Sequence, residues 1–112
     1  MTTPALVDEV RSVRDAGVDT ADIALATGAS ASTVTSWMSA RRTPSGDRRR
    51  RVLELAALVE RLRRVMEPAY VPVWLAKPQV ALDDERPIDV IADGRYREVS
   101  RLVAELESDS FS

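Results

Sequence analysis

A short segment in the N-terminal half concentrates side chains that could contact a nucleic acid. Five hydroxyl residues fall within seven positions and two arginines follow, namely Ser30, Ser32, Thr33, Thr35, Ser36, Arg41 and Arg42. Short hydroxyl side chains let a backbone approach base edges closely, and arginine pairs with phosphate oxygens. The segment therefore predicts a surface that contacts DNA through a few bases and several phosphates.

The apolar residues of this segment follow the period of a helix that could hold such a surface in place. Over about 31–40, Val34, Trp37 and Met38 fall on one side and the hydroxyls on the other, with Ser30 as the N-cap. We therefore expect Trp37 to lie in the core and the hydroxyl face to point outward.

The spacing before this helix is typical of a helix-turn-helix. Ala24, Gly28, Val34 and Trp37 follow one another at intervals of 4, 6 and 3 residues. They match a small residue at the helix crossing, a turn residue that tolerates positive φ, and two anchors of the second helix. The sequence predicts a helix-turn-helix over Thr20 to Ala40.

Caps and periodicity outline the remaining elements. Asp19 or Thr20 can cap the second helix, and Asp47 can cap the fourth. Helices are expected over about 4–16, 20–27, 31–40, 48–66 and 96–106, with short pieces over 70–76, 78–82 and 87–92. The helix over 48–66 carries two apolar stripes, which indicates a second packing partner beside the N-terminal helices.

The composition excludes most kinds of catalytic site. The chain has no cysteine and no histidine, which leaves no thiol nucleophile, imidazole base, disulfide or Cys/His metal site. Asp83, Asp84 and Glu85 stand together without a nearby nucleophile or cofactor cradle. We expect a protein that is not an enzyme and that needs no cofactor or metal.

Charge divides the chain into two unlike halves. Residues 1–64 hold eleven arginines against eight acids, and residues 65–112 hold five basic residues against ten acids. A basic half suits the phosphate backbone, whereas an acidic half suits a protein partner. No apolar run reaches the length of a membrane span, and MTTPALVDEVR lacks the layout of a signal peptide. These features predict a cytoplasmic protein.

Two segments resemble known families. TGASASTVTSWMSARRTPSG resembles the Xre-type repressor pattern, with Met38 where that pattern usually has an acidic residue. The stretches VWLAKPQVAL, RPIDVI and DGRYREVSRLVAELESDSF resemble the toxin-binding domain of the Xre/MbcA/ParS antitoxins.

The second resemblance implies a type II antitoxin whose partner is a RES-domain toxin, an enzyme that consumes NAD. It also implies that the C-terminal helix and tail cover the active site of the toxin, and that the complex represses its own promoter. In this sequence, those toxin-binding roles fall on Tyr96, Val99, Arg101, Leu102, Leu106, Asp109, Ser110, Phe111 and Ser112.

Together these observations predict an all-α chain in two parts. A helix-turn-helix domain over 1–66 precedes a helical toxin-binding domain over 67–112, and Trp74, Leu75, Pro78, Pro87 and Ile88 are expected in its core. Operator DNA and a second copy of the chain are further expected partners. Two alternatives stay open: a free-standing phage-type repressor whose C-terminal half only dimerises it, and an adaptor that binds protein alone.

Overall fold

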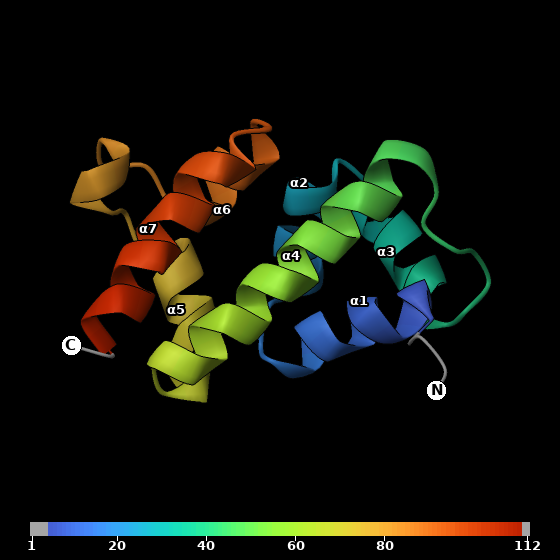
Figure 1. The fold of residues 1–112 in the computed structure, drawn as a ribbon. Coiled ribbons are helices and arrows are strands. Elements are labelled where there is room, and N and C mark those ends of the chain that lie inside the picture. The colour runs from blue at the N-terminus through green and yellow to red at the C-terminus, as the bar shows by residue number, and fades with distance from the viewer. Residues whose placement is uncertain (1–4, 111–112) are drawn as a thin grey trace.

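The computed structural model describes residues 5–110 and is all-α over that range (Figure 1). Its helices are α1 (Leu6–Asp15), α2 (Thr20–Thr27), α3 (Ala31–Met38), α4 (Gly46–Val65), α5 (Val71–Ala76), α6 (Pro87–Ala92) and α7 (Tyr96–Ser110), with 3₁₀ turns η1 (Pro68–Tyr70) and η2 (Val80–Leu82). Gln79 and Glu85 form an isolated β-bridge, and the described residues contain no strand. The predicted fold class is confirmed.

The long helix α4 organises the molecule. It runs between α1 on one side and α7 on the other, and it also contacts α2 and α5 (Figure 1). Its inner side is apolar and buried at Val52, Leu55, Leu58, Val59 and Leu62. The second stripe predicted on this helix therefore faces the C-terminal helices of the same chain.

The N-terminal helices pack against α4 through small and branched side chains. Val7, Val10 and Val13 of α1 are buried, whereas Leu6 is only half-buried. Gly17, which ends this helix, has a φ of +103°, and a Cβ there would lie 3.0 Å from Cγ of Pro72 in α5. A glycine is needed at this position because the two halves of the chain approach each other closely.

The C-terminal helices continue the same core. Trp74, Leu75, Pro87 and Ile88 are buried as expected, but Pro78 is exposed, because it lies in the turn that follows α5. Helix α6 packs on α2, so the hydrophobic core runs without a break from α1 to α7. The division of the chain near residue 66 stays a prediction.

Three predicted boundaries were wrong. Asp47 does not cap α4; Ser45 precedes the helix, and Asp47 in its first turn pairs with Arg50 and Arg51. Helix α3 ends at Met38 and not at Ala40, whose φ is +62°. Helix α7 continues past Leu106 to Ser110. The expected start of the first helix at Pro4 lies outside the described residues.

Neither a membrane-crossing helix nor a carboxylate metal site is found within the described part of the chain. No helix in that part combines the length and the apolar character that a membrane crossing requires. No group of three or more carboxylates there is arranged to hold a metal ion.

Candidate functional site

Side-chain caps and one glycine fix the path of the chain from α2 to α3. The Asp19 carboxylate accepts a hydrogen bond from the backbone N–H of Asp22 at 2.8 Å, and Ser30 Oγ accepts one from Thr33 N–H at 3.1 Å. Between the helices, Gly28 adopts a φ of +72°. The predicted capping by Asp19 and Ser30 and the predicted positive φ of Gly28 are confirmed.

The inner side of α3 is anchored in the core. Val34 is 0% exposed and Trp37 is 2% exposed, which confirms the prediction that this tryptophan packs and does not stack on bases. At the C-terminal end of the helix, Arg11 Nε donates a hydrogen bond to the carbonyl oxygen of Met38 at 2.9 Å. The orientation of α3 relative to α1 is therefore set by both packing and a charged donor.

The outer side of α3 presents hydroxyl groups to solvent. Ser30, Ser32 and Thr35 are exposed, and Thr33 and Ser36 are half-buried. Thr35 Oγ1 donates to the carbonyl oxygen of Ala31 at 3.0 Å, so its lone pairs remain available to accept a hydrogen bond from outside. The structure thus brings the five predicted hydroxyl residues together on one short helix and its cap.

Arg41 and Arg42 extend from the turn directly after α3. Both are exposed, and both backbone N–H groups donate to the carbonyl oxygen of Ser36, at 2.9 and 3.3 Å respectively. Their backbone positions are therefore tied to the end of α3, while their guanidinium groups reach into solvent. This geometry suits contacts to the phosphates that flank a base-reading helix.

The arginine run at the start of α4 is largely occupied within the chain. Arg50 pairs with Asp47 and Glu54, Arg51 pairs with Asp47, and Arg48 Nη2 donates to the carbonyl oxygen of Gly28 at 3.3 Å. The hydrogen bond from Arg50 holds the pKa of Asp47 below its ordinary value. Arg48 thereby ties α4 to the α2–α3 turn.

The predicted toxin-binding residues on α7 divide into core and surface. Val99 is 0% exposed, so it belongs to the core of this chain and is not presented to a partner. Tyr96, Leu102 and Leu106 are half-buried and pack against that core, whereas Arg101 is exposed.

The structure describes the last predicted toxin-binding residues only as far as Ser110. Asp109 lies exposed in the last turn of α7, and Ser110 is placed by its backbone as the final helical residue. Phe111 and Ser112 lie outside the described residues. The four residues from Glu107 to Ser110, which follow the helix predicted over 96–106, are therefore helical as well.

The turn before α6 presents a residue that the sequence reasoning missed. Val80 is 86% exposed, the most exposed of the large apolar side chains that the structure describes. It is the first residue of η2, whose next two residues, Ala81 and Leu82, line a hollow of about 220 Å³ together with Glu98, Arg101, Leu102 and Glu105 of α7. The element that carries Val80 therefore contacts α7.

A braced turn holds Val80 in this position. Asp83 and Asp84 have φ values of +55° and +64°, which is costly for residues other than glycine. Gln79 N–H donates to the Glu85 carbonyl oxygen at 3.1 Å, and Arg95 Nη1 donates to the Glu85 carboxylate at 2.9 Å. The cluster of Asp83, Asp84 and Glu85 thus forms a turn. The signal for this turn in the sequence was the pair of adjacent acids, Asp83 and Asp84, directly after two apolar residues.

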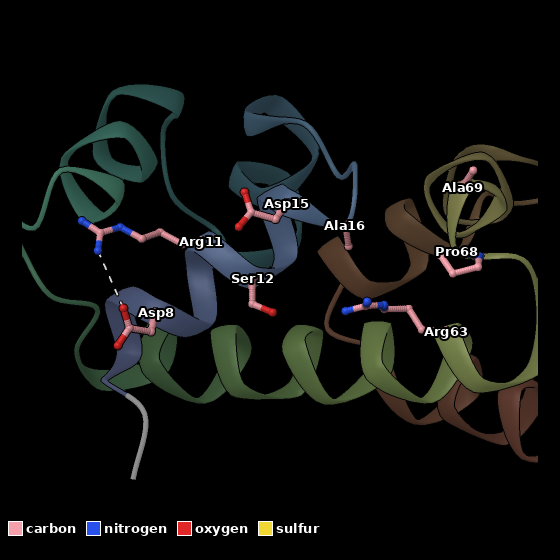
Figure 2. A pocket seen from close by; sticks show the side chains of 8 residues that line it. All are labelled: Asp8, Arg11, Ser12, Asp15, Ala16, Arg63, Pro68 and Ala69. Atoms are coloured by element: carbon pink, nitrogen blue, oxygen red, sulfur yellow. Dashed lines mark ion pairs between the residues drawn. The ribbon is translucent and has the colours of Figure 1, made fainter. Parts of the chain in front are cut away.

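Figure 2 shows a groove between α1 and the end of α4. Its volume is about 640 Å³, and its lining combines Asp8, Asp15, Arg11 and Arg63 with small and apolar residues. Asp8 and Arg11 form an ion pair at 3.7 Å across one end, and Arg63 reaches toward Ser12 and Ala16 from the other. The groove is therefore of mixed charge, with two carboxylates and two arginines in its lining.

Comparison with known proteins gives two similarities. No family model matches the chain. The chain is 29% identical over 75 residues to the "Mycobacterial cidal antitoxin MbcA" of Mycobacterium bovis and of Mycobacterium tuberculosis; this match covers 67% of the chain and 66% of each relative. The aligned part thus spans about two thirds of the length of these relatives.

The structural similarity extends over almost the whole chain. A chain in the crystal structure of the M. tuberculosis MbcT–MbcA toxin–antitoxin complex superposes with a TM-score of 0.81 and 23% identity, covering 96% of this chain and 97% of that one. The shared all-α fold therefore includes both the α2–α3 hairpin and the C-terminal helices.

Proposed function

We propose that this chain is the antitoxin of a toxin–antitoxin system. The observation that carries the proposal is the superposition over 96% of the chain on a component of a toxin–antitoxin complex. The 29% identity to the antitoxin MbcA supports the same assignment. In this role the chain binds its partner and is not itself an enzyme.

The proposed partner is a RES-domain toxin that consumes NAD. The support is the resemblance of the C-terminal stretches to the Xre/MbcA/ParS toxin-binding domain, together with the acidic charge of residues 65–112. A pocket built for the phosphates of NAD is basic, so an acidic surface can bind over it. The antitoxin would then act by covering the active site of the toxin.

The proposed toxin-facing surface consists of exposed or half-buried residues around α7, namely Val80, Tyr96, Arg101, Leu102, Leu106 and Asp109, continued by Ser110 to Ser112. Val80 offers an exposed apolar side chain on η2, the 3₁₀ turn that contacts α7. Apolar anchors surrounded by charged rims are typical of protein interfaces. Val99 is left out of this surface because it supports α7 from within the core.

The proposed second activity is promoter binding by α2 and α3 as a helix-turn-helix. Its support is an α3 whose hydroxyl side is exposed, whose N-terminus is capped by Ser30, and which is followed by the exposed Arg41 and Arg42. We propose that α3 enters the major groove with Ser32, Thr33, Thr35 and Ser36 near the base edges. Two copies of the chain would place two such helices on neighbouring half-sites of the DNA. Both proposed targets, the toxin and the promoter, would be met in the cytoplasm.

A repressor without a toxin is the competing assignment, because the DNA-facing features of α3 do not depend on the C-terminal half. Co-expression separates the two. The tagged chain is produced together with the proposed RES-domain toxin, and the complex is purified through the tag. A stable complex supports the antitoxin assignment, whereas a chain that binds its promoter but never retains that protein supports the repressor.

A further inference from the structure

The outward side of α4 carries an apolar strip that stays exposed among the described residues. Figure 1 shows α4 crossing the front of the molecule with α1 and α7 on either side. Leu53 is 42% exposed there, Ala57 is exposed, and Ala56 is half-buried. We call this strip, bounded by Arg49 and Glu60, the outer face of α4.

The outer face has one large side chain next to small ones. Hollows flank Leu53 on both sides: one of about 520 Å³ reaches Arg49 and Tyr96, and one of about 600 Å³ reaches Glu9 and Ala56. A leucine beside alanines can be received by the alanines of an identical surface. Two copies of this face can therefore fit together when their α4 helices run antiparallel, because the leucine of each copy then meets the alanines of the other.

The charged residues at the two ends of the outer face are opposite in sign, so they also match when a second copy is placed antiparallel. Arg49 and Glu60 stand eleven residues apart, or about 16 Å along a helix. Glu60 Oε2 lies 3.8 Å from Arg63 Nη1, and the hollow beside Glu60 is lined by Asp8, Glu9 and Glu60 and by no cation, so the lining of this hollow is acidic. Arg50, next to Arg49, already pairs with Asp47 and Glu54, so Arg49 is the cation best placed to meet another molecule.

We propose that two copies of this chain associate through the outer face of α4. The two helices run antiparallel, and the two-fold axis crosses them at the level of Leu55 along the helix. This arrangement puts Leu53 of each copy over Ala56 and Ala57 of the other, and Arg49 over Glu60. A parallel arrangement would set Arg49 against Arg49, where like charges repel. The inference deepens the pairing of copies suggested under the proposed function by naming its surface.

A charge exchange tests the antiparallel arrangement, with the mass of the full chain followed by sedimentation equilibrium over a wide range of concentrations. The wild type is expected to be a dimer. Arg49→Glu and Glu60→Arg should each weaken association by about tenfold or more, because each places like charges together twice. The double variant should recover the wild-type dissociation constant. A wild type that stays monomeric, or a double variant no tighter than the single ones, would overturn the proposal.

A second comparison tests the apolar part. Leu53→Glu should convert the dimer to a monomer, while Leu25→Glu, at a leucine of 45% exposure on α2, should leave the dimer intact. Equal effects of the two variants would contradict the assignment of the surface. A monomeric wild type in which Leu53→Glu instead weakens toxin binding would assign this face to the toxin. Because the mass is measured without toxin or DNA, neither result bears on the antitoxin assignment itself.

Discussion

Arg61 on α4 holds Glu107 on α7 through a bidentate ion pair, with Nη2 at 2.6 Å from Oε1 and Nε at 3.2 Å from both carboxylate oxygens. The same guanidinium donates from Nη1 to Ser100 Oγ at 2.8 Å. One α4 side chain thus contacts two positions that lie about two turns apart on the C-terminal helix. This contact fastens the part of α7 beyond Leu106 to α4.

Loss of this ion pair should destabilise the protein in a pH-dependent way. The hydrogen bond from Arg61 holds the pKa of Glu107 below its ordinary value of 4.5. A carboxyl whose pKa is lowered by folding contributes stability above its unfolded pKa and loses it as the pH falls through the folded value. Glu107→Gln should therefore lower the melting temperature at neutral pH by about 2 to 6 °C.

The pH profile provides the control. The difference in melting temperature between the wild type and Glu107→Gln should be constant near neutrality and shrink as the pH drops below about 4.5. Glu105→Gln, on an exposed residue of the same helix, should leave the melting temperature at neutral pH close to that of the wild type. A difference that stays constant down to acidic pH would remove the ion pair as its cause.

The turn at Gly28 should not accept a branched side chain. Its φ is +72°, and a Cβ there would lie 3.4 Å from Nη1 of Arg51. Gly28→Val should destabilise the chain by about 1 to 3 kcal/mol because a β-branched residue is strained at positive φ. Gly28→Asn should cost less, since asparagine tolerates this conformation. Chemical denaturation measures both; equal stabilities of the two variants would refute the role of backbone strain.

DNA affinity should depend on Arg41 without regard to sequence. Arg41→Ala should weaken binding to all operators and reduce the slope of log K against log salt concentration by about 1. Arg97→Ala, an equal loss of charge on the exposed side of α7, should leave the slope unchanged. Fluorescence anisotropy at several salt concentrations measures both. An unaltered slope for Arg41→Ala would exclude a phosphate contact.

Base preference should depend on Thr35, whose side chain is exposed in the middle of α3. Thr35→Ala should change the ranking of operators in a binding-site selection, because it removes a hydroxyl near the base edges. Ser108→Ala, an exposed hydroxyl on α7, serves as the control. An unchanged ranking for Thr35→Ala would contradict the assignment of α3 as the recognition helix.

Toxin affinity should depend on Val80. Val80→Glu should raise the dissociation constant by about tenfold or more, since it places a charge where the partner is expected to bind an apolar group. Val73→Glu is the matched control, because Val73 on α5 is 50% exposed and stands outside the proposed surface. Surface plasmon resonance with an inactivated toxin measures both. Similar losses for the two variants would place the interface elsewhere.

The N-terminal half was predictable in detail because its signals are local. The caps at Asp19 and Ser30, the turn at Gly28 and the buried Trp37 each depend on residues a few positions away. Asp47 was assigned wrongly because arginines three and four residues later compete for its carboxylate. Local patterns show which residues can cap but not which pairing is the most stable.

The C-terminal half depended on contacts that no local pattern contains. Helix α7 extends to Ser110 with the help of Arg61, which lies 46 residues before Glu107. Val99 shares a helical stripe with Leu102 and Leu106, so periodicity could not separate the buried member from the half-buried ones. Val80 precedes a turn that is braced by the ion pair of Glu85 with Arg95, and these two residues lie in different loops, one before and one after α6.

The most direct test of the antitoxin assignment is the NAD consumption of the proposed RES-domain toxin, measured while the purified chain is titrated in. The assignment predicts that turnover falls to the background rate near stoichiometric addition. It also predicts that a chain lacking residues 108–112 inhibits less while its melting temperature stays close to that of the wild type, because Glu107 and its ion pair with Arg61 remain. Full turnover in the presence of excess wild-type chain would contradict the assignment.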